Sequence, residues 1–130
     1  MPQKTRRSPD RRSRHTVLIV DDHPIVRQGL AQLIDQETDL QVCGQAEDAH
    51  EAMQAIGTLH PDMVIVDISL KNTSGMELIK DLKVQHPDLP VLTLSMHDEA
   101  DMAEKMLTAG AVAYLNKAGP SQDLLAAIRG

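Results

Sequence analysis

The feature that most constrains the fold is a series of short aliphatic runs, separated by segments with helical spacing. The runs lie at 17–20 (VLIV), 63–66 (MVIV), 91–94 (VLTL) and 112–115 (VAYL), with a weaker one at 40–46 (LQVCGQA). Strands that are apolar on both faces need cover on both faces, which is typical of a parallel sheet between two layers of helices. None of the runs approaches the roughly 20 apolar residues that a membrane-spanning helix needs.

The segments between the runs carry apolar residues three and four positions apart, which predicts a helix after each strand. The expected helices cover about 24–36, 48–59, 75–86 and 99–109, and a fifth starts near Ser121. Pro24 suits the first position of the first helix, with Asp22 or His23 as its cap. The apolar stripe of this helix is expected to be Ile25, Leu30, Leu33 and Ile34. The order is therefore βαβαβαβαβα, with right-handed crossovers.

The composition and charge distribution favour one acidic domain behind a basic leader. The chain has 130 residues, and Tyr114 is its only aromatic residue. Residues 1–14 hold six Lys or Arg and one Asp, a net +5, whereas the remainder holds seven basic and eighteen acidic residues, a net −11. We expect a disordered tail at 1–14 and a folded domain at 15–130, whose acidic surface is a poor one for DNA. No apolar segment of secretory type follows the tail, so a cytoplasmic location is expected.

Polar residues stand at the ends of four of the expected strands. Asp21 and Asp22 follow the first strand, Asp67 the third, Ser95 the fourth and Lys117 the fifth. Because open α/β sheets bind ligands beyond the carboxyl ends of their strands, these side chains are expected to converge. Two adjacent carboxylates repel each other unless a cation lies between them or water reaches both. A helix cap is the simpler interpretation of Asp22, but a cap needs only one acid.

Several motifs, taken in order, resemble the receiver domain of two-component response regulators. They are VLIVDDHP, MVIVDISLKNTSG, VLTLSMHD and GAVAYLNK, and together they cover about residues 16–129. The stretches VDDHPIVRQGL and GAVAYLNKAGPSQDLLAAIR resemble the NarL/FixJ (LuxR-type) branch in particular. The resemblance implies a flavodoxin-like (CheY-like) fold, a five-stranded parallel sheet in the order 2-1-3-4-5 with five helices on both faces.

The resemblance also implies a phosphorylation site with its metal. Asp67 would be the phosphoacceptor, because a carboxylate can act as a nucleophile toward phosphorus. Mg²⁺ would be held by Asp21, Asp22, Asp67 and the backbone carbonyl of Ser69, since this ion prefers oxygen ligands and keeps several waters. Asp22 is expected to be the more direct ligand, with Asp21 acting through water.

Three further residues receive roles from the resemblance alone. Lys117 and Ser95 would contact oxygens of the phosphoryl group. Tyr114 would be the switch residue, a ring that turns inward when Ser95 moves toward the phosphate. Each has an ordinary alternative: a solvated lysine, a serine at a strand end and a tyrosine that simply packs.

The implied function is a phosphoacceptor receiver that takes a phosphoryl group from a histidine kinase and is not a turnover enzyme. In the NarL/FixJ branch a DNA-binding output domain follows, so DNA contact is expected only through a domain absent from this sequence, with a homodimer on phosphorylation. Two alternatives stay open, a stand-alone receiver and a non-phosphorylated protein-interaction module. A phosphohydrolase is disfavoured, because Ser69 stands where such enzymes carry a second aspartate as general acid.

Overall fold

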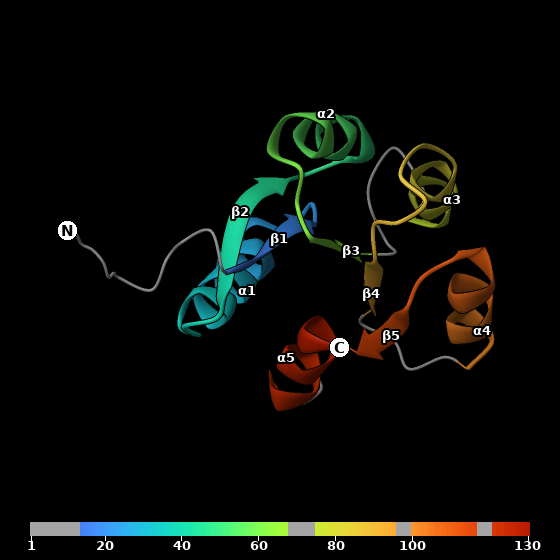
Figure 1. Cartoon of the computed structure of the whole chain (residues 1–130). Helices are drawn as coiled ribbons and strands as arrows, with labels where there is room; N and C mark the ends of the chain where they lie inside the picture. Colours follow the sequence, from blue (N-terminus) through green and yellow to red (C-terminus); the bar gives the residue numbers. More distant parts are fainter. Residues whose placement is uncertain (1–13, 68–74, 96–99, 117–120) are drawn as a thin grey trace.

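The computed structural model of the chain describes residues 14–67, 75–95, 100–116 and 121–130. Strands and helices alternate throughout these residues (Figure 1). The strands are β1 (His15–Val20), β2 (Leu40–Ala46), β3 (Met63–Asp67), β4 (Val91–Ser95) and β5 (Ala113–Asn116). The helices are α1 (Pro24–Asp35), α2 (Ala49–Leu59), α3 (Gly75–Gln85), α4 (Ala100–Ala109) and α5 (Ser121–Arg129). All strand pairs are parallel in the order β2-β1-β3-β4-β5, which confirms the predicted topology.

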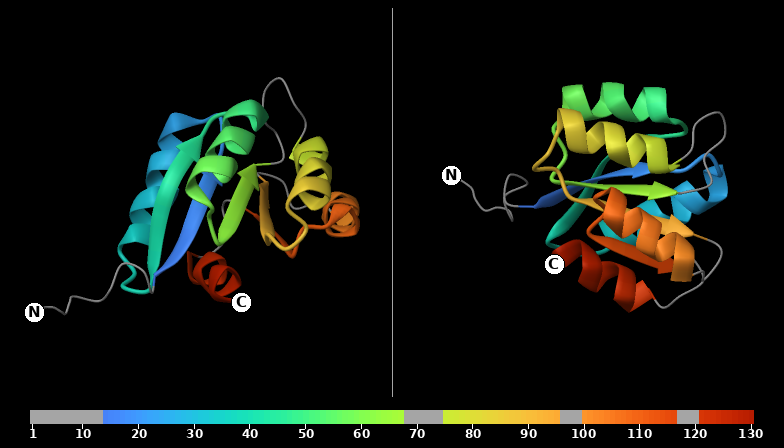
Figure 2. Two further views of the ribbon diagram at one scale, coloured as in Figure 1. Left: turned by 45° about the horizontal axis from the view of Figure 1, so that its top comes forward. Right: turned by 90° about the vertical axis from the view of Figure 1, so that its right-hand side faces the viewer.

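The core forms two layers, one on each face of the sheet. Side chains alternate along each strand, so Val17 and Ile19 of β1 join the layer under α1 and α5. Leu18 and Val20 point the other way and join the layer under α2, α3 and α4. Figure 2 shows the two sets of helices on opposite faces. All four side chains are fully buried, which explains why the strand is aliphatic from Val17 to Val20.

The helix ends follow local sequence signals. Asp48 is the N-cap of α2, and its side chain accepts a hydrogen bond of 2.8 Å from the backbone N–H of Glu51. The same helix ends at His60, which takes a left-handed conformation with φ 51°. Gly110, with φ 123°, follows the end of α4, where the sequence predicts a stop. No helix in the described part of the chain is both long and apolar enough to cross a membrane.

The prediction for the inward face of α1 is wrong at one residue. Ile25 was expected to face the core, but it is 84% exposed. The buried residue of this helix is Ile34, and Leu30 and the half-buried Val26 lie four and eight positions before it. Residues four apart share a helix face, whereas Ile25 lies about 100° further round the helix. Ile25 is therefore an exposed apolar residue in the first turn of α1.

Candidate functional site

The carboxyl ends of β1, β3 and β4 bring together acids and a hydroxyl that are distant in sequence. Asp21 and Asp22 follow β1 directly, Asp67 is the last residue of β3, and Ser95 is the last of β4. Val20 pairs with the residue before Asp67 in the sheet, so Asp21 and Asp67 continue neighbouring strands at the same level. Asp21, Asp67 and Ser95 are only 1%, 1% and 2% exposed. The sheet edge therefore holds buried polar groups, as the strand-end pattern predicts.

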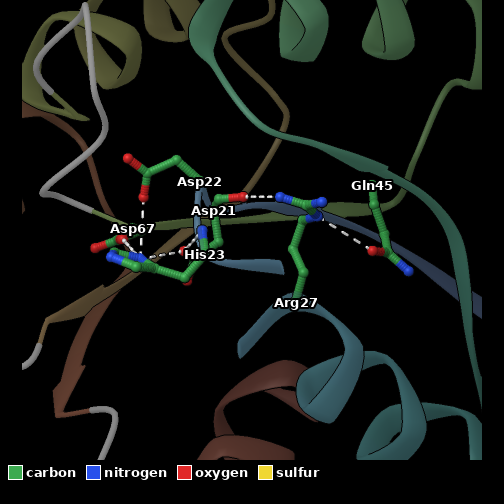
Figure 3. Close-up of polar contacts among 6 residues, drawn as sticks. All are labelled: Asp21, Asp22, His23, Arg27, Gln45 and Asp67. Carbon is green, nitrogen blue, oxygen red and sulfur yellow. Dashed lines mark hydrogen bonds and ion pairs between the residues drawn. The ribbon is translucent and has the colours of Figure 1, made fainter. Parts of the chain in front are cut away.

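The three carboxylates form one cluster with the side chain of His23 (Figure 3). One ligand atom from each of Asp21, Asp22, His23 and Asp67 can be chosen so that all four lie within 4.8 Å of one another. His23 Nδ1 lies 2.9 Å from Asp21 Oδ1, 3.0 Å from Asp22 Oδ1 and 3.6 Å from Asp67 Oδ2. The imidazole thus contacts all three acids, although the sequence suggested no role for His23 beyond a helix cap.

At the start of α1, the side chain of Asp21 accepts a hydrogen bond from the residue at the N-cap position. His23 occupies the N-cap position, with an extended backbone and no hydrogen bond from its side chain to the helix. The backbone N–H of His23 instead donates to Asp21 Oδ1 at 2.8 Å. Of the two residues predicted for the cap, His23 therefore occupies the N-cap position and Asp22 does not.

Arg27 supports the loop of the site from the first turn of α1. Its Nη1 donates to the backbone carbonyl of Asp21 at 2.6 Å, and its Nε donates to Gln45 Oε1 at 3.3 Å (Figure 3). The backbone N–H of Arg27 donates to the carbonyl of His23, which places the side chain one turn above the site. Sequence reasoning missed this residue. The only available signal was a basic residue one turn after an acidic pair, at the start of a helix.

Two further predicted residues, Ser95 and Tyr114, lie on the neighbouring strands β4 and β5. Ser95 pairs with Asn116 across these strands, and Tyr114 pairs with Thr93 two positions earlier. Tyr114 is partly buried and packs against the core layer under α2, α3 and α4. Ser69 and Lys117 lie outside the described residues, so their predicted roles are not placed by the structure.

The chemistry of the cluster fits a hard divalent cation. Asp21, Asp22 and Asp67 offer carboxylate oxygens, the ligands that Mg²⁺ prefers, and the side chain of Asp22 is only 7% exposed. Carboxylates gathered away from water repel each other, and a cation among them removes this cost. In an octahedral site with bonds of about 2.1 Å, neighbouring ligand atoms lie about 3 Å apart and opposite ones about 4.2 Å. In the cluster, the chosen ligand atoms all lie within 4.8 Å of one another, so these distances are compatible with binding to a single ion.

Comparison with known proteins gives a consistent result over nearly the whole chain. Residues 17–129 match the family described as the response regulator receiver domain. The response regulator GacA of Pseudomonas viridiflava is 34% identical over 113 residues, which are 87% of this chain and 53% of that protein. The transcriptional regulatory protein YdfI of Bacillus subtilis is 37% identical over 118 residues, 88% of this chain and 55% of that protein. The chain thus spans about half the length of these curated relatives.

Solved structures show the same arrangement of strands and helices. A LuxR-family two-component response regulator from Aurantimonas sp. SI85-9A1 superposes with a TM-score of 0.86 and 32% identity, over 90% of this chain and 84% of that one. The signal receiver domain of the putative response regulator NarL from Mycobacterium tuberculosis gives a TM-score of 0.82, over 91% of this chain and 98% of that one. At 24% identity this second likeness concerns the fold alone.

Proposed function

The chain belongs to the response regulator receiver domain family, and we propose that it accepts a phosphoryl group from a sensor histidine kinase on Asp67. Domains of this family are signalling modules that interact with histidine kinases, and the relatives of this chain are transcriptional regulators. Receiver domains bind Mg²⁺ at an acidic pocket of the kind formed by the Asp21, Asp22 and Asp67 cluster. The assignment of individual roles to these three acids is part of the proposal.

One observation carries the proposal. Asp67 is the last residue of a buried strand, and its carboxylate lies close to those of Asp21 and Asp22. Its carboxylate is 1% exposed and lies at the end of β3, beside the pair that follows β1. Asp67 would act as the nucleophile, while Asp21 and Asp22 would hold the cation together with the backbone carbonyl of Ser69. When bound, Mg²⁺ supplies positive charge that offsets the repulsion between a carboxylate and an anionic phosphoryl group.

The proposed transfer forms one bond and breaks another. An oxygen of the Asp67 carboxylate attacks the phosphorus of a phosphohistidine on the kinase. The new P–O bond makes an aspartyl phosphate, and the P–N bond breaks as the imidazole nitrogen keeps the electron pair and takes up a proton from water. Lys117 and Ser95 would contact oxygens of the transferred group. Slow hydrolysis of the acyl phosphate would return Asp67 to its starting state, so the chain is a reversible switch and not a turnover enzyme.

The proposed output is a shift between two conformations. Phosphorylation adds negative charge and strong acceptor oxygens at the carboxyl edge of the sheet. Ser95 is well placed to respond, because it ends the strand next to β3. Tyr114 lies on the neighbouring strand β5, where its partly buried ring packs against the core layer under α2, α3 and α4. A population shift at α4, β5 and α5 would then favour a homodimer, with DNA contact through an output domain outside this sequence.

A non-phosphorylated interaction module is the less favoured alternative. Such a module would not need a buried cluster of acids, which costs stability in the absence of a cation. In this chain, carboxylate oxygens of Asp21, Asp22 and Asp67 lie close enough together to bind a single ion. A cytoplasmic location remains part of the proposal, because it follows from the kinase partner.

Intact-mass analysis after incubation with acetyl phosphate tests the proposal. The wild type should gain one phosphoryl group in the presence of Mg²⁺ and none in its absence. Asp67→Asn should gain none in either condition, while Asp88→Asn, a change to an exposed acid outside the cluster, should behave as the wild type. An adduct of equal yield without Mg²⁺, or on Asp67→Asn, would overturn the assigned chemistry.

A further inference from the structure

The proposed function leaves His23 without a role, although its ring lies against all three acids of the cluster. Nδ1 lies within 3.0 Å of one oxygen each from Asp21 and Asp22 and 3.6 Å from Asp67 Oδ2. The distance between Nδ1 and Asp21 Oδ1 is that of a hydrogen bond. The ring nitrogen therefore occupies the space toward which the three acids point (Figure 3).

These distances match those between neighbouring ligands around one metal ion. For bonds of about 2.1 Å, adjacent ligands are about 3.0 Å apart in an octahedral site and about 3.4 Å apart in a tetrahedral one. The three distances from His23 Nδ1, between 2.9 and 3.6 Å, fall around these values. The imidazole thus needs little movement to become a ligand beside the carboxylates. Its side chain is 54% exposed, so the surroundings leave room for that adjustment.

We propose that His23 Nδ1 is a ligand of the cation site and shifts its preference from Mg²⁺ toward divalent transition ions such as Co²⁺ and Ni²⁺. The inference deepens the proposed function and rests on the cation site assigned there. Imidazole is a good ligand for transition ions and a poor one for Mg²⁺, which selects oxygen. A metal held by Nδ1 would take the lone pair of that nitrogen, and the ring hydrogen would then be on Nε2.

The backbone around His23 supports such a role. Its N–H donates to Asp21 Oδ1 at 2.8 Å, which keeps one carboxylate close to the ring. Arg27 donates to the carbonyl of Asp21 at 2.6 Å and holds the same loop from the other side. Ring and carboxylate are thus placed by the same few residues, a condition for a preorganised metal site.

Titration with Co²⁺ and with Mg²⁺ tests the inference, using calorimetry for both ions and visible absorption for Co²⁺. The variants are His23→Asn and His23→Ala. Asn is a favourable N-cap residue, so the first variant removes the nitrogen ligand while keeping the start of α1. His50→Ala is the matched control for adventitious binding at surface histidines, because His50 is exposed on α2.

Loss of the nitrogen ligand should weaken Co²⁺ binding by at least about tenfold and change Mg²⁺ binding by less than about threefold. The Co²⁺ absorption band of both His23 variants should move to lower energy, because oxygen and water are weaker ligands than imidazole. Unchanged Co²⁺ affinity in the His23 variants would overturn the inference, and so would equal losses for both ions, which indicate a structural role. A different result would contradict the proposed cation site itself. In that case the wild type would bind neither ion, or would bind both ions no more tightly than Asp22→Ala does.

Discussion

Asp21 illustrates how a single residue of the site is held from three directions. Its backbone N–H donates to the carbonyl of Ala46 at 3.0 Å, and its own carbonyl accepts from Arg27 at 2.6 Å. Its carboxylate accepts from the backbone N–H of His23 at 2.8 Å. Hydrogen bonds that involve a charged group contribute about 1.5–3 kcal/mol each. The geometry of this acid is therefore set by the fold before any cation binds.

Replacement of Asp22 tests the balance between repulsion and metal binding. Without Mg²⁺, Asp22→Ala should be more stable than the wild type by roughly 0.5–2 kcal/mol, because one of three repelling charges is gone. Its affinity for Mg²⁺ should fall by at least about tenfold. Urea unfolding followed by circular dichroism, with and without Mg²⁺, measures both effects, because an ion that binds only the folded state raises its stability.

Asp88→Ala is the matched control, since Asp88 is exposed and lies outside the acidic cluster. It should show the same stabilisation by Mg²⁺ as the wild type. If Asp22→Ala also kept the full stabilisation by Mg²⁺, Asp22 would not be a ligand.

The sequence predicts the acids of the cluster and the hydroxyl of the site better than their supporting residues. Asp67 and Ser95 could be placed because a polar residue at the end of an aliphatic run marks the sheet edge. The contacts of His23 and Arg27 depend on where two side chains point across the first turn of α1. No local pattern encodes that direction, so both contacts were missed. Ile25 was misplaced for a related reason, because two neighbouring apolar residues competed for one inward position.

Helix α5 is joined to the turn between α1 and β2 by one arginine. Arg129 Nε and Nη2 donate to the two carboxylate oxygens of Asp39 at 2.8 and 2.9 Å, and Nη2 donates to Glu37 at 2.6 Å. The hydrogen bonds from Arg129 lower the pKa of Asp39 from 3.8 to about 2. The two acids raise the pKa of Arg129 further above its usual value. The end of the last helix is thereby fixed beside β2.

Loss of this ion pair should destabilise the fold in a pH-dependent way. The pKa of Asp39 is depressed in the folded state, so the pair contributes fully above about pH 4 and its contribution is lost as the pH falls through about 2. Arg129→Gln should therefore have a lower urea midpoint than the wild type at pH 7, and the difference should shrink toward zero near pH 2. Lys105→Gln, at an exposed position of α4, should show a smaller difference at pH 7. A difference for Arg129→Gln that stays constant across this range would contradict the assignment.

The turn from α4 to β5 depends on a glycine. Gly110 has φ 123°, and a Cβ built there would lie 2.5 Å from Lys83 Cγ. Gly110→Ala should lower the free energy of unfolding by about 1–3 kcal/mol, through backbone strain and this clash. Gly57→Ala is the matched control, because Gly57 lies within α2 and a Cβ there has nothing within 4 Å. It should be neutral or stabilising by up to about 1 kcal/mol in the same urea experiment. Equal effects of the two changes would show that the turn tolerates a side chain.

The aliphatic pattern in the sequence is clearer for the inner strands of the sheet than for the edge strands. The inner strands β1, β3 and β4 have long buried runs, and their aliphatic patterns predicted them clearly. The two edge strands are only half-buried along most of their length, so they have less need of aliphatic residues. The register of β2 against β1 also shifts between Val17 and Leu18, which breaks its pattern. For β5 the prediction of 112–115 was displaced by one residue from Ala113–Asn116.

The arrangement of the whole molecule produces the site. Residues 21, 67 and 95 are far apart in sequence, and the strand order β1-β3-β4 makes their strands neighbours. Parallel strands end at the same edge, so one topology places the three acids and the hydroxyl together. Below this edge, one core layer packs against each face of the sheet. The division into a basic tail at 1–14 and a folded unit at 15–130 remains a prediction.

The central claim is that Asp67, and not one of its two acidic neighbours, carries the phosphoryl group. Borohydride reduces an aspartyl phosphate to homoserine, so peptide mapping after phosphorylation and reduction identifies the modified residue directly. The account predicts homoserine at position 67 only, dependent on Mg²⁺ and on acetyl phosphate or a phosphorylated kinase. Homoserine at position 21 or 22, or none at all in protein that has gained a phosphoryl group, would contradict it.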